Sequence, residues 1–325
     1  MEEIVALSVK HNVSDLHLCS SGHFYWRKDG VMEPAPCALP NISALLDLWL
    51  TPEQHSQFKH HGQLDFAVEL ANGQRLRANA FLQVAGVSLA LRILPQVCPE
   101  LTALQVPEAL MALLQEQSGL VLVCGATGSG KSTTLAAMVG ELNRQTQAHI
   151  ITLEDPVEFV HKPPQGVIQQ REVGLHCASF AAGLKGALRQ DPDVILLGEL
   201  RDSETIRLAL TAAETGHLVL ATLHTRGAAQ AVERLVDVFP AEEKSMVRTQ
   251  LAGSLKGVVA QQLAVRKGGG RVALFELLVV TPAVSSLVRE GKTHQLPGVL
   301  QTGKQAGMQT FEQSRAERDA AGMLA

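Results

Sequence analysis

The residues that point most directly to chemistry form the octapeptide GATGSGKS at positions 125–132. It fits the pattern G-x-x-x-x-G-K-[ST] at every defined position, and an apolar run before it and a helix-like run after it argue against a chance match. In this pattern glycines let backbone N–H groups turn inward around phosphates, and the helix start adds its positive dipole. Lys131 would reach the β- and γ-phosphates, and the Ser132 hydroxyl would ligate magnesium. The predicted nucleotide contacts are Gly125, Ala126, Thr127, Gly128, Ser129, Gly130, Lys131, Ser132 and Thr133.

Acidic residues at strand ends are the second chemical signal. Hydrolysis of a bound nucleotide needs magnesium and a positioned water, and acids at the carboxyl ends of parallel strands point into the ligand crevice. Glu199 ends the run DVILLGE, where many phosphate-loop ATPases carry an aspartate. The run ITLEDPVEF carries three more acids, which are Glu154, Asp155 and Glu158. Spacing alone does not divide the roles among these four carboxylates.

Each acid also has a structural interpretation. Asp202 directly precedes the expected helix 203–214 and suits an N-terminal cap. The same interpretation fits Glu199 less well, because Glu199 sits at the strand end itself. The three acids of ITLEDPVEF could belong to a solvated loop, although their place beside the expected phosphate site argues for a function.

Two histidines flank the apolar run in TGHLVLATLHT, residues 215–225. His224 follows the end of the expected strand, so it could sense the γ-phosphate or the catalytic acid. His217 follows a glycine at a helix end, where a C-terminal cap is at least as good an explanation. The sequence therefore favours a functional role for His224 only.

From Gly119 onward, apolar strands alternate with helices. The expected strands GLVLVCG, HIITLED, DVILLGE and HLVLATLHT are largely apolar, which is typical of strands buried on both faces. The segments STTLAAMVGELNRQ, FAAGLKGALRQ and SETIRLALTAAETG are predicted to be helices. This alternation predicts an α/β fold with a mostly parallel sheet covered on both faces.

The chain of 325 residues is long enough for two domains. Residues 1–98 open with an amphipathic helix and continue with short strand-like pieces at 15–18, 23–30, 63–70, 74–81 and 87–94, which predicts a small α+β domain. A proline-punctuated connector follows at 99–117. Residues 118–325 form the larger domain, with a C-terminal helical subregion from about 271 after the break at GGG, residues 268–270.

The bulk composition excludes several classes of protein. The net charge of −4, the 4% aromatic content and the absence of a basic, aromatic-interleaved stretch argue against a nucleic-acid translocase. The five cysteines are far apart, which argues against a zinc ribbon or a disulfide framework and fits a reducing cytoplasm. No apolar run approaches the length of a membrane span, so we expect no direct membrane insertion.

Four motifs in order resemble those of a known family. GATGSGKST, ITLEDPVEF, DPDVILLGELRD and TGHLVLATLHT are similar to the Walker A, Asp box, Walker B and His box of the type II/type IV secretion ATPases. Within that superfamily the chain resembles the PilT proteins, the retraction motors of type IV pili. The resemblance extends to SVKHNVSDLHL near the start and to residues 236–255 and 287–314, so it covers nearly the whole chain.

The resemblance implies a fold, an activity and partners. It implies a PAS-like N-terminal domain joined by a flexible linker to a RecA-like phosphate-loop ATPase domain, assembled as a ring-shaped homohexamer. The implied function is Mg²⁺-dependent ATP hydrolysis that drives pilus retraction and twitching motility. The ring would be cytoplasmic and would reach the inner membrane through a pilus or secretion platform protein.

The resemblance also implies roles for particular residues. Glu199 corresponds to the Walker B acid, which serves magnesium directly or through water, since this run typically ends in Gly-Glu in the family. Glu158 of the Asp box would be the general base, and His224 of the His box the sensor. Arg77 and Arg92 match N-domain arginines that complete the phosphate site, and basic groups supplied across a domain interface would link hydrolysis to domain rotation.

Two departures from the family pattern bear on the function. The family's AIRNLIRE-type motif, which is associated with retraction, appears here as AVSSLVRE, with Ser285 and Ser286 in place of Arg and Asn. This change leaves open an ATPase of another secretion or pilus machine, or a nucleotide-binding regulator without retraction activity. The tetracysteine zinc motif of the assembly ATPases is absent from the sequence, which favours the PilT-like interpretation.

Overall fold

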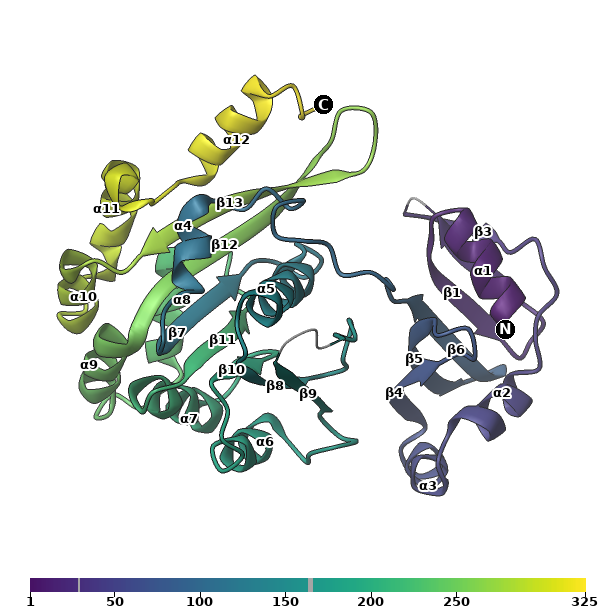
Figure 1. Cartoon of the computed structure of the whole chain (residues 1–325). Coiled ribbons are helices and arrows are strands. Elements are labelled where there is room, and N and C mark those ends of the chain that lie inside the picture. The colour runs from purple at the N-terminus through teal and green to yellow at the C-terminus, as the bar shows by residue number, and fades with distance from the viewer. Residues whose placement is uncertain (29, 163–165) are drawn as a thin grey trace. The chain divides into compact units, whose positions relative to one another are not determined.

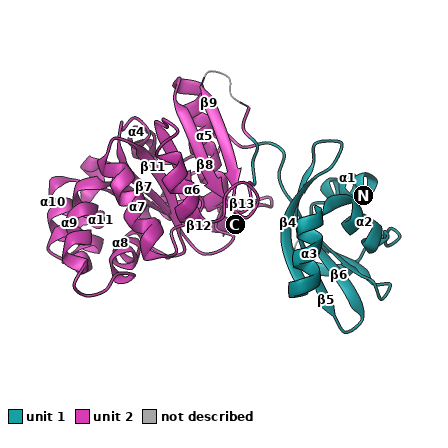
Figure 2. Cartoon of the chain, turned by 90° about the horizontal axis from the view of Figure 1, so that it is seen from below, with its two compact units in different colours: residues 1–97, 158–160 teal, residues 98–157, 161–325 magenta. Residues whose placement is uncertain are grey.

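The computed structural model describes residues 1–28, 30–162 and 166–325 (Figure 1), so Asp29 of the expected strand at 23–30 lies outside the described part. The chain divides into two compact units (Figure 2). The first comprises Met1–Val97 with Glu158–Val160, and the second comprises Cys98–Val157 with His161–Ala325. Each unit has its own hydrophobic core.

The first unit is a six-stranded antiparallel sheet with helices over one face. Its strand order is β3-β2-β1-β6-β5-β4. Alternate residues such as Leu16 and Leu76 pack with Val5, Leu46 and Phe58 of the helices, whereas the residues between them lie on the opposite face. The elements are α1 (Glu2–Lys10), β1 (Val13–Cys19), β2 (Phe24–Lys28), β3 (Val31–Pro34), α2 (Ile42–Trp49), α3 (Pro52–His61), β4 (Gln63–Glu69), β5 (Arg75–Gln83) and β6 (Gly86–Ile93).

The second unit contains a seven-stranded sheet in the order β13-β12-β7-β11-β10-β8-β9. All neighbouring pairs are parallel except β12 and β13, which confirms the predicted mostly parallel α/β sheet. Its strands are β7 (Gly119–Cys124), β8 (His149–Glu154), β9 (Val167–Glu172), β10 (Val194–Leu197), β11 (Leu218–Leu223), β12 (Leu255–Val265) and β13 (Arg271–Val279).

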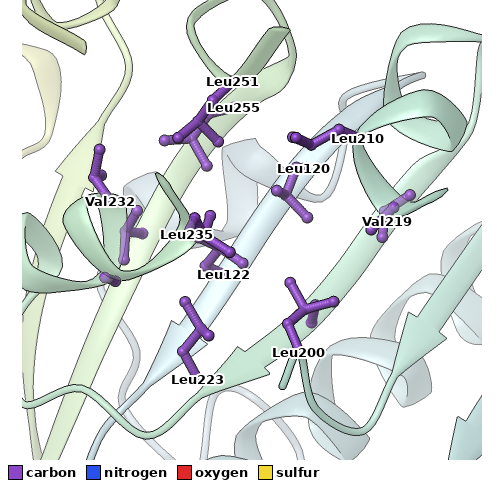
Figure 3. Packing of buried hydrophobic residues seen from close by; sticks show 14 of the residues in the cluster. Leu120, Leu122, Leu200, Leu210, Val219, Leu223, Val232, Leu235, Leu251 and Leu255 are labelled. Atoms are coloured by element: carbon purple, nitrogen blue, oxygen red, sulfur yellow. The ribbon is translucent and has the colours of Figure 1, made fainter. Parts of the chain in front are cut away.

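Both faces of this sheet are buried, as the apolar strands predicted. Leu120 and Leu122 of β7 pack on the side of α7 (Ser203–Glu214), α8 (Ala228–Asp237) and α9 (Lys244–Ser254) (Figure 3). Val121 and Val123 point to the other side, against α4 (Glu108–Leu113) and α5 (Lys131–Gln145). Each such side chain contributes about 1.5–3 kcal/mol on burial, so the central strand that precedes the phosphate loop is firmly held.

The connector and the C-terminal subregion both contribute to the second unit. Within the stretch expected as a linker, Leu110 and Leu113 of α4 are buried in the core of this unit. At the other end, residues 271–279 form β13, and the turn before it uses three glycines with positive φ. The C-terminal helices begin after this strand; they are α10 (Pro282–Arg289), η1 (Thr293–Gln295), α11 (Leu296–Thr302), η2 (Gly303–Ala306) and α12 (Phe311–Ala320). The remaining helix, α6 (Phe180–Ala187), lies between β9 and β10 in sequence.

Candidate nucleotide site

The glycine-rich loop lies between β7 and α5, in the strand–loop–helix setting that the motif requires. The backbone N–H of Ser129 donates to the carbonyl of Ala126 at 3.1 Å, which closes the turn. Gly130 is the N-cap of α5 and has φ of 90°, a conformation that strains any residue with a Cβ. The loop N–H groups and the start of α5 therefore form an anion-binding end of the helix.

Lys131 is the buried cation of this loop. The residue is 8% exposed, and its Nζ donates to the carbonyls of Gly125 at 2.9 Å and Ala126 at 3.1 Å. The same Nζ lies 3.5 Å from Nδ1 of His224. Next along the helix, the side chain of Ser132 is exposed, as expected for a hydroxyl that meets a ligand. The Lys131 side chain thus links the phosphate loop to the end of another strand.

Glu199 follows β10 and joins this group of charges. Its Oε1 lies 2.6 Å from Nη2 of Arg201, and its Oε2 lies 3.3 Å from Nε2 of His224. The Glu199 side chain is only 11% exposed, whereas that of Arg201 is 71% exposed. Since β7, β11 and β10 are neighbours in the sheet, a continuous line of side chains crosses their carboxyl ends, namely Lys131, His224, Glu199 and Arg201.

Backbone contacts hold the Glu199 and His224 segments together. The N–H of Gly198 donates to the carbonyl of Leu153 on β8 at 2.7 Å, which continues the strand ladder. The N–H of Leu200 donates to the carbonyl of Thr222 at 3.0 Å, and the Thr222 hydroxyl donates to the carbonyl of Gly198. The ends of β10 and β11 are therefore fastened on both sides of Glu199.

The remaining predicted site residues divide between the two units. Glu154, at the end of β8, accepts from the Thr152 hydroxyl at 2.6 Å, and Asp155 is exposed. Glu158 belongs to the first unit, as do Arg77 and Arg92, which are directly opposite each other on β5 and β6. The phosphate loop belongs to the second unit.

Arg92 has a defined ion-pair partner within its own unit. Its Nε donates to Oδ1 of Asp15 at 2.8 Å, and Asp15 is also its cross-strand neighbour on β1. Burial raises the pKa of Asp15, but hydrogen bonds from Ser14 and Arg92 together outweigh it and leave that pKa below its ordinary value. This contact is made through Nε of the guanidinium.

The structural interpretations hold for Asp202 and His217. Asp202 is the N-cap of α7, with Oδ1 accepting from the Thr205 N–H at 2.8 Å and Oδ2 from the Thr205 hydroxyl at 2.9 Å. The Nδ1 of His217 lies 3.0 Å from the carbonyl of Ala212 near the end of the same helix. Both side chains satisfy helix-end groups rather than the candidate site.

We expect Asp202→Ala to lower the free energy of unfolding by about 1 kcal/mol while ATP turnover of the folded protein is retained. The reason is that α7 would lose both cap hydrogen bonds but the side chains of Glu199 and His224 would keep theirs. Urea unfolding and phosphate release measure the two effects, with Asp202→Asn as the control because Asn also caps helices well. A loss of turnover without a loss of stability would assign Asp202 to the chemistry instead.

The residues present fit a magnesium ion that is held largely by phosphates. Within the described ranges no group of three or more His, Cys, Asp or Glu side chains could hold a metal by itself. A nucleotide-bound Mg²⁺ does not need such a cage, because it keeps several waters and takes one or two protein oxygens beside the phosphates. The exposed Ser132 hydroxyl and the Glu199 carboxylate are oxygen ligands of the right kind.

Two residues at the site were not found from the sequence. Arg201 pairs with Glu199, and its position two residues further along the same loop was the available signal. Gln261 of β12 accepts a hydrogen bond from Thr134 in the first turn of α5, at 2.7 Å. No local pattern joins Gln261 to Thr134, because 127 positions separate them in the chain.

A glycine loop with a buried lysine, and an acid and a histidine on adjacent parallel strands, define a RecA-like phosphate-loop ATPase. The type II/IV secretion system protein family matches residues 56–269. The chain belongs to this family, and within it to the pilus and secretion ATPases. No helix in the described part of the chain is both long and apolar enough to cross a membrane.

Individual relatives cover almost the whole chain. The uncharacterized protein YggR of Escherichia coli K12 is 66% identical, over 100% of this chain and 99% of its own. The type IV pilus retraction ATPase PilT of Pseudomonas aeruginosa PAO1 is 45% identical, over 95% of this chain and 91% of its own. A crystal structure of the pilus retraction motor PilT with bound ADP superposes with a TM-score of 0.90 at 39% identity, over 99% of this chain and 94% of that one.

Proposed function

We propose that this chain is a Mg²⁺-dependent ATP hydrolase that works as a homohexameric motor and powers retraction of a type IV pilus. The observation that carries the proposal is the continuous contact from Lys131 through His224 to Glu199, because it joins the lysine of the glycine loop to a carboxylate at a strand end. The similarity to PilT over nearly the full length supports the retraction role.

In this proposal the phosphate loop binds the nucleotide, and the acids and the histidine take part in its hydrolysis. The loop N–H groups and Lys131 would hold the β- and γ-phosphates, and Ser132 and Glu199 would hold Mg²⁺, which would supply positive charge to the phosphates. Glu158 is the general base that takes a proton from the attacking water. His224 contacts both Lys131 and Glu199, so it senses whether the γ-phosphate is present.

Arg77 and Arg92 of the first unit are assigned a phosphate-binding role as well. They are cross-strand neighbours, and two like charges directly opposite each other are unfavourable unless an anion lies nearby. Asp15 serves Arg92 in this way. A polyphosphate would serve both arginines.

The proposed partners are further copies of the chain and an inner-membrane platform protein. The ring would work in the cytoplasm and reach the membrane through that platform. The ring is placed there because a PilT-like motor must transmit force to the base of a pilus.

A second candidate is an ATPase of another secretion or pilus machine, or a regulator without retraction activity. The observation that favours it is the altered segment of α10. Ser285 donates to the carbonyl of Ala252 on α9 at 2.6 Å, and Ser286 donates to Glu290 at 3.0 Å. Both hydroxyls are thus used within the chain, where the family's Arg and Asn would present larger polar groups.

The proposal is tested by twitching motility in a pilated bacterium that lacks its own retraction ATPase. We expect the wild-type chain to restore twitching and the Glu199→Gln form to restore none, since only the former turns over ATP. Immunoblots of both strains control for expression. An absence of rescue by a wild-type chain that hydrolyses ATP when purified would reject retraction and leave the second candidate.

A further inference from the structure

The hairpin formed by β12 and β13 meets the candidate site from the C-terminal part of the chain. β12 is the parallel neighbour of β7, and its last pair, Ala260 with Cys124, lies directly before the phosphate loop. Gln261 is therefore level with the loop. Its side chain is 3% exposed, and its Oε1 accepts from the Thr134 hydroxyl at 2.7 Å; Thr134 itself is 1% exposed.

The phosphate loop also packs directly on Gln261. A Cβ on Gly125 would lie 2.4 Å from the Gln261 carbonyl oxygen, and one on Gly130 would lie 2.7 Å from Gln261 Nε2. Heavy atoms do not approach this closely without a shift of the neighbour. The first and last glycines of the loop therefore pack against one residue of β12, which leaves no room for a Cβ and restricts where the loop can lie.

The other strand of the hairpin reaches the segment that carries His224. Glu276 is paired with Ala260 across the hairpin, so its side chain lies on the opposite sheet face from Gln261. Its Oε1 accepts from the N–H of Ala228 at 2.8 Å, at the start of α8. The N-cap residue of that helix is Gly227, which has no side chain to cap it, and Glu276 provides the acceptor instead.

Glu276 therefore anchors the short connection from His224 to α8. Only three residues separate His224 from Ala228, so a fixed helix start restricts where the imidazole can lie. Burial raises the pKa of Glu276, the Ala228 N–H opposes this shift, and the Glu312 carboxylate adds to it.

We propose that the β12–β13 hairpin positions the two halves of the ATPase site through two residues, Gln261 for the phosphate loop and Glu276 for His224. Gln261 bonds to Thr134 and Glu276 bonds to Ala228, so both are assigned as positioning residues. The inference rests on the proposed function, because it takes Lys131 as the phosphate ligand and His224 as part of the turnover machinery. It predicts that Gln261 affects the Kd for ATP, whereas Glu276 affects kcat.

Gln261→Leu is expected to weaken ATP binding roughly tenfold, because it leaves the buried Thr134 hydroxyl without its acceptor and alters the support of the loop. Thr134→Val removes the same hydrogen bond from the other side with little change in shape and should have a similar effect. The double variant should lose no more affinity than either single variant. Gln262→Leu, at the exposed neighbouring position, is the matched control and should bind ATP as the wild type does.

Glu276→Leu is expected to lower kcat roughly tenfold with the Kd for ATP within about twofold of the wild type, because only the His224 side loses its anchor. Glu276→Gln should keep most of the turnover, since an amide oxygen can accept from Ala228. Glu204→Gln removes an exposed carboxylate that pairs with Lys185 at the surface and serves as the control. All variants are compared as full chains by fluorescent-nucleotide titration, phosphate release and thermal melting.

Lys131→Ala and His224→Ala are measured in the same assays as references. If both references lose their expected function while folded Thr134→Val and Glu276→Leu behave as wild type, the hairpin inference is wrong and the proposed function stands. The inference is also wrong if both variants lower affinity and turnover equally, since the two residues then do not affect different constants. If Lys131→Ala binds ATP normally, the proposed function itself fails. If Gln261→Leu does not fold, the effect on the Kd for ATP is tested with Thr134→Val alone.

Discussion

Replacing Glu199 by glutamine is expected to lower ATP turnover by a factor of about 10² to 10⁴, the range associated with a positioned acid or base. The substitution keeps the shape of a side chain that is 11% exposed, so the fold and ATP binding should persist. What is lost is the negative charge that faces Arg201 and His224. Phosphate release under saturating ATP, together with nucleotide titration, measures the two halves of this expectation.

The control for this variant is Glu204→Gln, which removes an exposed carboxylate on α7 that pairs with Lys185 at the surface. Its turnover should match the wild type. Glu158→Gln is measured beside it. Its turnover should also fall, because the general base and the magnesium-serving acid should both be needed. Near-normal turnover of Glu199→Gln would remove Glu199 from the mechanism.

Lys131→Ala is expected to weaken ATP binding itself by about 10- to 100-fold, the loss that corresponds to a charge-assisted hydrogen bond. The buried ammonium donates to the loop carbonyls of Gly125 and Ala126, and it also contacts His224. Removing it takes away the positive charge that a β- or γ-phosphate would meet. Calorimetric titration with ATP and with ADP measures the change, and the effect should be larger for ATP.

An exposed lysine provides the comparison for this second experiment. Lys185 on α6 pairs with Glu204 at the surface, so Lys185→Ala should leave nucleotide affinity unchanged. Thermal melting of both variants separates a loss of binding from a loss of folding. Unchanged ATP affinity in folded Lys131→Ala would contradict the assignment of the phosphate loop.

The local parts of this protein could be predicted from its sequence. The glycine loop is eight contiguous residues, and its flanking strand and helix follow from apolar pattern and length, so β7 and α5 lie where expected. Apolar strands alternating with helices also predicted the parallel sheet. These features depend on residues that are close together in the sequence, so they can be recognised from the sequence itself.

The contacts that complete the site join distant residues. A contact of His224 with the catalytic acid was among the expectations, whereas that of Gln261 with Thr134 was not found from the sequence. Glu199 and His224 are 25 positions apart, and Gln261 and Thr134 are 127 apart. Whether such residues meet is decided by the order of strands in the sheet, which no single segment encodes. The order β12-β7-β11-β10 brings together strands that are far apart in the chain.

Helices α2 and α3 were missed although the chain carries their signals. Thr51 forms a capping box with Gln54, Pro52 occupies the first turn, and Gly62 ends α3 in the left-handed region with φ of 70°. The sequence of α3 is polar and has only one buried residue, Phe58. A search for hydrophobic periodicity therefore overlooks it, whereas a search for caps would have found it.

The strand order has a consequence for how the protein is made. β7 is the first strand of its sheet to leave the ribosome, yet its two neighbours, β11 and β12, begin at Leu218 and Leu255. At about 5–20 residues per second, a newly synthesised β7 waits roughly 5–20 s for its first partner. Its backbone groups, and the apolar face that later meets α7, α8 and α9, stay unpaired over that interval. The nascent chain is therefore most exposed to aggregation and chaperone capture after its phosphate loop has been synthesised and before His224 appears.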